Sequence, residues 1–212
     1  ILLVREREKA RRPLISIRPA LWRMANRWGS RRLRAWSQND QYRRGRWARL
    51  GGSRRPAVVE LVTDLAAGGA VVEFGCGEGH LALAVDPAAY STWVGYDIAR
   101  VAVERARQQA GSDRCRFEVL DCTAWPGSPG VQLIVAEECL YYLRGADLLR
   151  FLERCRASLA PDGAMLVTFS RAGRHPEAEA ACRLTFVGVD TVDDLAGDRY
   201  LVLRPGSHVT ID

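Results

Sequence analysis

From about residue 57 onward, apolar positions recur alternately with a helical period and in short continuous runs. The segment AVVELVTDLAAGG has a helical stripe followed by a glycine pair typical of a helix end, and the stripe consists of Val58, Leu61, Val62 and Leu65. Similar stripes predict helices within ARVAVERARQQAG and over residues 146–159. Apolar and β-branched runs between the helices predict five strands, at 70–74, 92–97, 115–121, 131–137 and 164–169.

Strands and helices that alternate in this way predict right-handed crossovers and a parallel sheet with helices on both faces. The fold class is therefore doubly wound α/β. The tail adds a predicted helix in PEAEAACRL and short strands near 184–190 and 199–204. With 212 residues, 48% of them apolar, the chain can bury a sizeable core, and we divide it into an arm, residues 1–56, and a sheet domain, residues 57–212.

The stretch VVEFGCGEGH, residues 71–80, ends the first predicted strand with a carboxylate and then places glycines at alternate positions. Ligands of open parallel sheets bind beyond the carboxyl ends of the strands, and glycines let the backbone bend and approach a ligand there. A dinucleotide fingerprint can be placed on Gly77, Gly79 and Ala82, but the charge of Glu73 would repel a pyrophosphate. Glu73 instead favours S-adenosylmethionine, whose sulfonium and ammonium groups are positive. A tight strand–helix connection without a ligand is the alternative interpretation.

Two further acids end the next two predicted strands. Asp97 follows Glu73 by 24 residues, where a carboxylate can accept from both ribose hydroxyls, and an NAD site also uses an acid there. Asp121 ends the third strand, where it can accept from an adenine amino group, and Ile98 offers an apolar surface to the purine. Each acid alone suits a helix cap equally well, but three in succession favour a nucleoside ligand.

The motifs VVEFGCGEGH, VGYD, FEVLD, LIVAEECLYYL and LAPDGAMLV resemble, in order and spacing, those of class I S-adenosylmethionine-dependent methyltransferases over residues 57–170. The resemblance implies a Rossmann-like, mostly parallel seven-stranded sheet whose last strand is antiparallel. It also implies a set of cofactor-binding residues that includes Cys76. The others are Glu73, Gly75, Gly77 and Glu137 at the methionine end, Asp97 at the ribose, and Asp121 with Cys122 at the adenine.

At the subgroup level, EECLYYL and the short chain are similar to nodulation N-methyltransferases and to small O-methyltransferases of secondary metabolism. The Asn/Asp-Pro-Pro-aromatic motif of enzymes that methylate nucleobase amino groups is missing, since AEEC stands in its place. This departure argues against exocyclic amines of adenine or cytosine as acceptors.

Few residues can act as a base on the acceptor. His175, in the loop after the fifth predicted strand, is a candidate catalytic residue, with an ordinary loop residue as the alternative. His80 is expected to pack against or cap the next helix. Tyr141 can border the acceptor or pack in the core, and Glu137 or Glu138 can orient an amine.

The arm, residues 1–56, holds 17 basic residues and three acids, whereas the rest of the chain carries a net negative charge. Tryptophans alternate with arginines in it, and Leu21, Ala25 and Trp28 share one helical face, which predicts a basic helical extension. We expect the arm to cover the acceptor and cofactor site, with Tyr42 or Arg46 binding the methionine carboxylate. The alternatives are nucleic-acid binding, a homodimer contact or a membrane surface.

The remaining composition excludes some classes. No apolar run approaches the length of about 18 residues that spans a bilayer. The six cysteines form neither a C-x-x-C pair nor a zinc-ligand pattern, so we predict no metal, reduced thiols and a cytoplasmic location.

Taken together, the sequence predicts a methyltransferase that uses S-adenosylmethionine and acts on a nitrogen or oxygen of a small-molecule acceptor in natural-product biosynthesis. The alternative is an RNA methyltransferase that holds its substrate with the basic arm. An NAD-linked enzyme and a noncatalytic binding protein are the remaining hypotheses.

Overall fold

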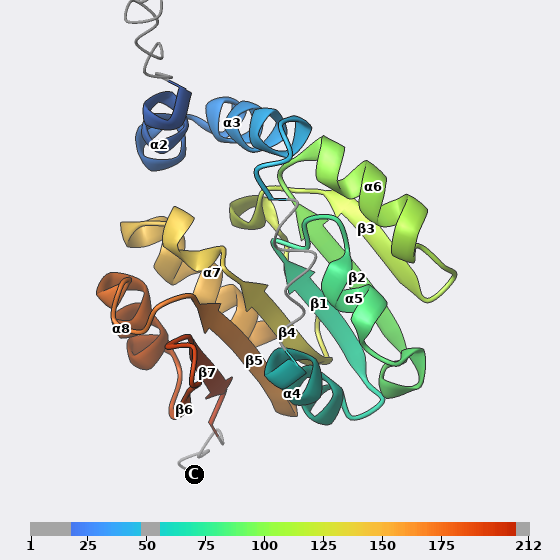
Figure 1. The fold of residues 1–212 in the computed structure, drawn as a ribbon. Helices are drawn as coiled ribbons and strands as arrows, with labels where there is room; N and C mark the ends of the chain where they lie inside the picture. Colours follow the sequence, from blue (N-terminus) through green and yellow to red (C-terminus); the bar gives the residue numbers. More distant parts are fainter. Residues whose placement is uncertain (1–17, 48–55, 207–212) are drawn as a thin grey trace, which may run out of the picture.

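The structure is a computed structural model, and it describes residues 18–47 and 56–206. Its centre is a seven-stranded sheet with the strand order β3-β2-β1-β4-β5-β7-β6 (Figure 1). The strands are β1 (Ala70–Phe74), β2 (Thr92–Asp97), β3 (Cys115–Val119), β4 (Val131–Glu137), β5 (Leu159–Phe169), β6 (Gly188–Asp193) and β7 (Arg199–Arg204). Strands β1 to β5 pair in parallel, and β7 pairs antiparallel with β5 and β6. The predicted doubly wound, mostly parallel sheet is confirmed.

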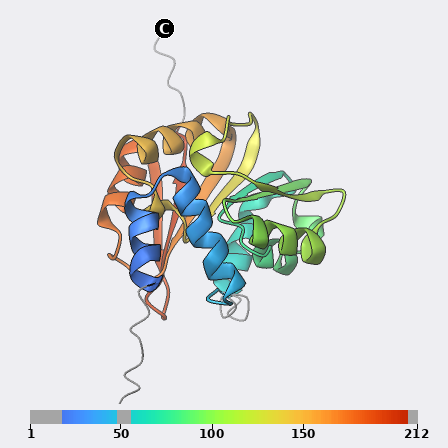
Figure 2. The same ribbon diagram turned by 90° about the horizontal axis from the view of Figure 1, so that it is seen from above.

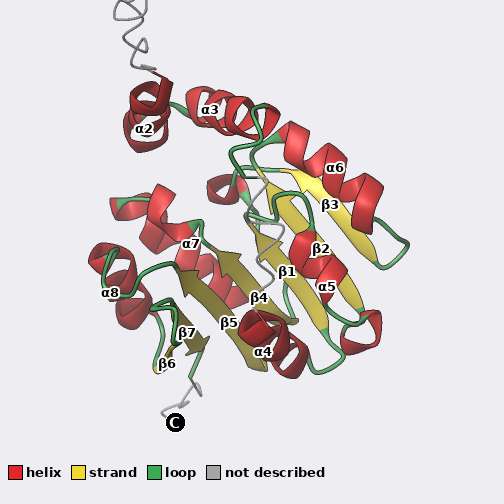
Figure 3. Ribbon diagram, viewed as in Figure 1, coloured by secondary structure: helices red, strands yellow, loops and turns green. Residues whose placement is uncertain are grey.

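Helices cover both faces of this sheet, as Figure 3 shows. The helices are α2 (Arg18–Trp28), α3 (Arg31–Arg43), α4 (Pro56–Ala66), α5 (His80–Ala84), α6 (Arg100–Ala110), α7 (Gly145–Ser158) and α8 (Pro176–Thr185), with short 3₁₀ turns η1 (Pro87–Ala89), η2 (Cys122–Ala124) and η3 (Leu140–Tyr142). Helices α4, α5 and α6 pack in one apolar cluster, whereas α7 and α8 pack in a second cluster on the opposite face.

The central strands are apolar on both faces because each face carries a core. In β4, Leu133 and Val135 belong to the cluster under α4, α5 and α6, while Ile134 and Ala136 belong to the cluster under α7 and α8. All four side chains are buried. The apolar run LIVA within β4, residues 133–136, is therefore the pattern of a parallel strand covered on both sides, as the sequence predicted.

Strand β5 differs from the sequence prediction at its start. The sequence predicted the fifth strand at 164–169, but β5 begins at Leu159 and includes the PDG segment. The register with β4 shifts between Val131 and Leu133, so residues 160–163 form an irregularity in the ladder. Gly163 is needed there because a Cβ would approach the carbonyl oxygen of Val131 to 2.8 Å. Gly163 thus permits a close approach of two strands.

Helices α2 and α3 form the described part of the arm and lie across the carboxyl ends of the strands (Figures 1 and 2). The indole of Trp22 donates to Asp40 at 3.1 Å, which joins the two helices. Asn39 Oδ1 accepts from the backbone N–H of Val101 at 3.0 Å, which joins α3 to the first turn of α6. The buried side of α2 carries Trp22 and Ala25, whereas Leu21, expected on that side, is 43% exposed.

The remaining residues of the arm, 1–17 and 48–55, lie outside the described residues, as does the side chain of Trp28. Within the described ranges, no helix combines the length and the apolar character that crossing a membrane would require.

Candidate functional site

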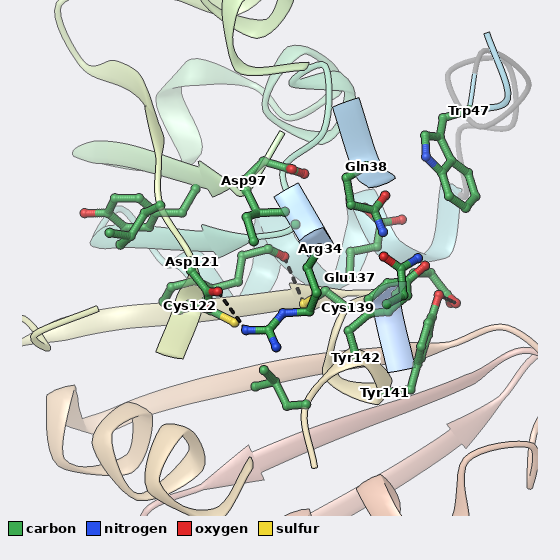
Figure 4. A pocket seen from close by; sticks show the side chains of 18 of the residues that line it. Arg34, Gln38, Trp47, Asp97, Asp121, Cys122, Glu137, Cys139, Tyr141 and Tyr142 are labelled. Carbon is green, nitrogen blue, oxygen red and sulfur yellow. Dashed lines mark hydrogen bonds and ion pairs between the residues drawn. The ribbon is translucent and has the colours of Figure 1, made fainter. Parts of the chain in front are cut away.

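A cavity of about 270 Å³ opens at the carboxyl ends of the parallel strands, beneath the arm (Figure 4). Loops after β1, β2, β3, β4 and β5 contribute to its lining, and α2, α3 and the following turn close it. The lining residues are Asn26, Arg34, Gln38, Tyr42, Trp47, Phe74, Gly75, Tyr96, Asp97, Ile98, Leu120, Asp121, Cys122, Glu137, Glu138, Cys139, Tyr141, Tyr142, Leu143 and Ser170. This is the position at which ligands bind in open α/β sheets.

The glycine turn after β1 has a left-handed backbone at Gly75, Gly77 and Gly79, with φ of +76°, +53° and +79°. Gly75 lines the cavity, as expected for a turn that approaches a ligand. At Gly77, however, a Cβ would lie 2.8 Å from the hydroxyl oxygen of Tyr42, and at Gly79 it would lie 3.1 Å from Ala106. The turn therefore needs glycine for contacts within the protein as well as for an approach to a ligand.

Asp97 lies at the end of β2 and is a member of the cavity lining. Its Oδ2 accepts from the backbone N–H of Gly77 at 3.0 Å, and its Oδ1 accepts from Ala99 at 2.7 Å. These bonds fix the carboxylate between the glycine turn and the start of α6. Burial raises the pKa of Asp97 to about 6, although the backbone hydrogen bonds oppose the shift. Ile98, the next residue, also faces the cavity.

Glu73 is 1% exposed and is absent from the cavity lining. Its Oε2 accepts from the indole Nε1 of Trp93 at 3.0 Å. Burial, reinforced by the charge of Glu137, raises the pKa of Glu73 to about 8. The carboxyl group thus favours its neutral form at pH 7. The sequence suggested that a negative Glu73 attracts the positive groups of the cofactor, and this attraction requires that the carboxyl group first loses its proton. Its role at the methionine end stays a prediction.

Asp121 follows β3, and its two oxygens bind different partners. Oδ1 accepts from the backbone N–H and the hydroxyl of Thr123, at 3.0 and 2.8 Å. Oδ2 accepts from Nη2 of Arg34 at 3.0 Å, so an arginine of α3 reaches into the cavity to the acid expected at the adenine (Figure 4). Burial opposes ionisation, but the bonds from Thr123 and Arg34 prevail and lower the pKa of Asp121. The adjacent Cys122 also lines the cavity, and burial raises its pKa to about 12.

Tyr42 and Arg46, the two arm residues expected at the methionine carboxylate, lie in different surroundings. Tyr42 lines the cavity, and burial, with the charge of Asp97, raises the pKa of its hydroxyl, which stays protonated. Arg46 is exposed and absent from the lining, and its guanidinium lies over the rings of Trp22 and Trp47, at 5.3 and 5.8 Å from their centroids. Carboxylate binding by either residue stays a prediction.

The loop after β4 brings two acids to the cavity. Glu137 ends β4, and Glu138 follows with a φ of +51°, an uncommon backbone conformation for a residue with a side chain. Glu138 Oε2 accepts from the hydroxyl of Ser170 at 2.9 Å and from that of Tyr141 at 3.4 Å. The ring of Tyr141 lies 4.7 Å from that of Tyr142, and both rings line the cavity. The EECLYYL motif therefore builds one wall of the site.

His175 precedes α8 and lies behind this wall. Its ring stacks on Tyr141 at 4.2 Å between centroids and is absent from the cavity lining. Burial, with the nearby charge of Arg174, lowers its pKa. Tyr141 lies between the His175 ring and the cavity, so His175 could contact an acceptor only if Tyr141 moved. The catalytic role of His175 stays a prediction. His80 is the first residue of α5, and its Nε2 lies 3.5 Å from Oε2 of Glu78, but Gly79 rather than His80 is the N-cap of the helix.

Two buried polar atoms in the cavity lining have no hydrogen-bond partner among the described residues, namely Oδ1 of Asn26 and Nε1 of Trp47. Buried polar groups usually have partners, so these atoms suit a polar ligand that supplies them. The chemistry of the lining fits S-adenosylmethionine, because acids stand at the ends of β2 and β4 and Gly75 carries no side chain. Within the described ranges, no group of three or more His, Cys, Asp or Glu residues is placed to hold a metal ion.

Sequence reasoning missed the lining residues Arg34, Gln38, Asn26, Trp47 and Cys139 as site members. The first three belong to α2 and α3, whose helical pattern does not indicate which face meets the sheet. Trp47 had a weak signal, since it follows Arg46 directly in the sequence. Cys139 lies between the motif acids and tyrosines, where its neighbours in the sequence were a usable signal.

Comparison with known proteins connects this site to a family. Residues 71–163 match the model of a methyltransferase domain family. No curated protein matches the chain significantly in sequence.

Solved structures with the same fold include three methyltransferases. The N-methyltransferase NodS from Bradyrhizobium japonicum, in complex with S-adenosylhomocysteine, is 19% identical with a TM-score of 0.57. The match covers 69% of this chain and 84% of the NodS chain. A TehB-like S-adenosylmethionine-dependent methyltransferase from Corynebacterium glutamicum is 18% identical with a TM-score of 0.59, covering 79% and 98%. One from Leishmania major is 14% identical with a TM-score of 0.60, covering 74% and 76%.

The domain match covers the glycine turn, the acids after β2 and β3, and the loop after β4, which are the parts that build the cavity. At these identities the solved structures show the fold, which is the one found here. Residues 71–163 therefore match a methyltransferase domain, and this domain lies within a fold that S-adenosylmethionine-dependent methyltransferases share.

Proposed function

We propose that the protein transfers the methyl group of S-adenosylmethionine to a nitrogen or oxygen atom of a small-molecule acceptor, in natural-product biosynthesis and in the cytoplasm. One observation carries the choice of acceptor. A single cavity joins Asp97 and Asp121, after β2 and β3, to a wall of Glu138, Tyr141 and Tyr142 after β4, and the arm covers it. A covered cavity of this kind suits a small ligand better than a polymer.

The residues near β1, β2 and β3 suit the cofactor. Asp97 is fixed by two backbone bonds and presents its carboxylate to the cavity, where it can accept from ribose hydroxyls. Ile98 and Cys122 offer apolar contact to a purine, and Gly75, which has no side chain, leaves room for the methionine part of the cofactor. Glu137, at the end of β4, is placed to accept from an ammonium group. When bound, the cofactor supplies a methyl carbon activated by its sulfonium.

The wall after β4 suits the acceptor. Methyl transfer needs a nucleophile aligned near the methyl carbon and protected from water, which aromatic walls can provide. Tyr141 and Tyr142 offer flat surfaces, and Trp47 presents an indole N–H without a partner among the described residues. The Glu138 carboxylate, held by Ser170 and Tyr141, can orient an amine or accept the proton of a hydroxyl.

Isothermal titration calorimetry of the purified protein with S-adenosylmethionine and S-adenosylhomocysteine tests the cofactor assignment. Replacing Asp97 with Asn should weaken binding of both by about 10-fold or more, because a buried hydrogen-bonded charge contributes on the order of 1.5–3 kcal/mol. The matched control is Asp64→Asn on the exposed side of α4, which should bind as the wild type does. Equal affinities for the wild type and Asp97→Asn would contradict the ribose assignment.

The acceptor class is tested by incubation with panels of small amines, phenols and RNA fragments and by mass detection of a gain of one methyl group. Nitrogen or oxygen methylation of a small molecule is the expected result. Methylation confined to RNA would support the alternative below and contradict the small-molecule acceptor.

The RNA alternative rests on the exposed arginines of the arm. Arg23, Arg43 and Arg46 are exposed on the segment that closes the cavity. Phosphate contacts weaken steeply as salt rises, so an RNA substrate predicts an affinity that falls by orders of magnitude between about 50 and 200 mM salt. Filter binding at the two salt concentrations measures this.

A homodimer through the arm is a further part of the proposal. It is supported by large apolar side chains of α2 and α3 that are 43–62% exposed, namely Leu21, Met24, Leu33 and Trp36. Light scattering after size-exclusion chromatography should give twice the chain mass of 23.6 kDa, and substitution of Met24 and Leu33 by Glu should return it to one chain mass. A single chain mass for the wild type would contradict the dimer.

A further inference from the structure

The contact between Arg34 and Asp121 lies at the end of the cavity that the proposed function gives to the adenine. Nη2 of Arg34 donates to Oδ2 of Asp121 at 3.0 Å, and the two side chains are 24% and 3% exposed. Nη1 of Arg34 donates to the carbonyl oxygen of Gly29 at 3.2 Å, at the turn between α2 and α3. Figure 4 shows the guanidinium inside the cavity, beside Asp121 and Cys122.

This contact leaves little of the Asp121 carboxylate for a ligand. Thr123 binds Oδ1 with two bonds, and the Arg34 guanidinium lies directly against Oδ2. An adenine amino group that donates to Oδ2 would need the space that this guanidinium occupies. A guanidinium–carboxylate bond is also roughly twice as strong as one from a neutral amine. The adenine amino group alone therefore cannot displace Arg34 from Asp121. Contacts that the rest of the cofactor makes in the cavity must supply part of the binding free energy.

We propose that Arg34 competes with the adenine amino group for Asp121, so that the cofactor binds only after the Arg34–Asp121 ion pair has opened. The inference rests on the proposed function, because it takes the adenine position from that proposal. It assigns to the arm a role at the cofactor site that sequence motifs do not reveal: Arg34 is a gating residue at the purine end.

The surrounding contacts determine what moves when the pair opens. Helix α3 stays joined to α6 through Asn39 and Val101, one turn and a half from Arg34, and to α2 through Asp40 and Trp22. The Arg34 side chain can thus turn toward Gly29 while α3 keeps its place. Arg31 lies at 4.0 Å from Asp121 and is 59% exposed, so it keeps a positive charge near the carboxylate after Arg34 has left.

The apparent affinity for the cofactor is then the intrinsic affinity multiplied by the fraction of molecules in which the pair is open. Replacing Arg34 with Gln removes the competing charge and keeps most of the side-chain volume. We expect S-adenosylhomocysteine to bind roughly 3- to 10-fold more tightly to Arg34→Gln than to the wild type, which corresponds to an open fraction of about 0.1–0.3. Isothermal titration calorimetry measures the change.

A matched control variant and two fragments of the cofactor test whether the change in affinity arises at the adenine end of the cavity. Arg32→Gln removes the same charge from an exposed position of the same helix and should leave the affinity unchanged. Adenosine should gain as much affinity from Arg34→Gln as S-adenosylhomocysteine does, whereas homocysteine should gain none. In an Asp121→Asn background, Arg34→Gln should have no further effect, because the pair is already absent. Thermal melting of each variant verifies that it is folded.

Weaker binding by Arg34→Gln would overturn the proposal, since it would show that Arg34 holds the cofactor. An unchanged affinity would overturn it as well, because the guanidinium would then lie outside the path of the adenine. Failure of the proposed function looks different: neither S-adenosylmethionine nor S-adenosylhomocysteine would bind the wild type or any variant. Binding of the cofactor to the wild type therefore tests the proposed function. The direction in which Arg34→Gln changes the affinity tests the role of Arg34.

Discussion

The sheet domain and the arm are held together by different kinds of interaction. Seven strands and the helices on their two faces share two continuous apolar clusters, with side chains such as Phe74, Phe151 and Trp93 almost fully buried. The arm joins this domain through individual polar contacts instead, chiefly Asn39 to Val101 and Arg34 to Asp121. Burial of apolar area is the dominant stabilising contribution in folding, whereas a single hydrogen bond contributes about 1 kcal/mol.

The comparison indicates where substitutions should act. Changes in the sheet domain should lower the free energy of unfolding, because each one removes part of a shared core. Changes on the cavity side of the arm should mainly alter ligand binding, because five lining residues come from it, namely Asn26, Arg34, Gln38, Tyr42 and Trp47. Substitutions in the two regions, with stability and ligand binding measured separately, test this division.

Replacing Phe151 with Ala should lower the free energy of unfolding by about 3–5 kcal/mol. The ring is fully buried in α7 and packs edge-on against Phe74 with 4.9 Å between centroids. Urea unfolding measures the loss. The control is Leu149→Ala on the same helix, where the side chain is 40% exposed and about 1 kcal/mol or less should be lost. Equal losses at the two positions would contradict the packing of α7 described above.

Replacing Glu73 with Gln should remove a pH dependence of stability that belongs to the sheet domain. The folded protein raises the pKa of Glu73 from 4.5 to about 8, so it binds a proton that the unfolded chain releases at lower pH. The resulting stabilisation is present below about pH 4.5 and is lost as the pH rises through about 8. Between these values the wild type should lose on the order of 3 kcal/mol relative to Glu73→Gln.

Thermal and urea unfolding at about pH 5, 6.5 and 8 measure the difference between the two proteins. Asp97, whose pKa is raised to about 6, titrates in both, so its contribution cancels. The control is Glu60→Gln, an exposed position on α4, which should follow the wild type. Parallel curves for the wild type and Glu73→Gln would mean that Glu73 is ionised in the folded protein.

Replacing Asn39 with Ala should lower the free energy of unfolding by about 0.5–2 kcal/mol, the usual effect of losing a helix N-terminal cap. Helix α6 has Ala99 at its N-cap, without a side-chain acceptor, and Asn39 of α3 supplies the acceptor to Val101. Faster hydrogen exchange at the Val101 amide checks that the cap was lost. Unchanged exchange would show that α3 does not dock on α6 in solution.

Replacing Tyr42 with Phe should have the smallest effect of this series on stability, below about 0.5 kcal/mol, while lowering cofactor affinity by roughly 2- to 5-fold. Its hydroxyl lies over Gly77 and stays protonated, so it can donate to a ligand. Calorimetric titration and urea unfolding separate the two effects. A loss of stability with no change in affinity would assign Tyr42 to packing alone.

The fold followed from the sequence because the pattern of a buried parallel strand is local. The run LIVA, residues 133–136, shows two buried faces without reference to any other residue, and the order of strands and helices then restricts the topology. Asp97 and Asp121 were placed in the same way, because the carboxyl ends of parallel strands share one edge of the sheet. Both line the cavity, as do Ile98, Cys122 and Glu137.

The charge of Glu73 and the arginine beside Asp121 could not be found in this way. The pKa of Glu73 depends on how fully Trp93 and its neighbours exclude water, and burial of that degree is a property of the packed molecule. Arg34 was one of 17 basic residues in the arm, and only the packing of α3 on α6 distinguishes it from Arg32.

By itself, the sequence determined the alternation of strands and helices, the glycine turn, the acid that ends β2 and the acid that follows β3. These features depend on local periodicity and on backbone conformations that few residues can adopt. The tertiary structure alone decided that Arg34 binds Asp121, that Tyr42 covers Gly77 and that His175 lies behind Tyr141. Contacts between segments far apart in the chain depend on the relative placement of packed elements, and no local pattern encodes that placement.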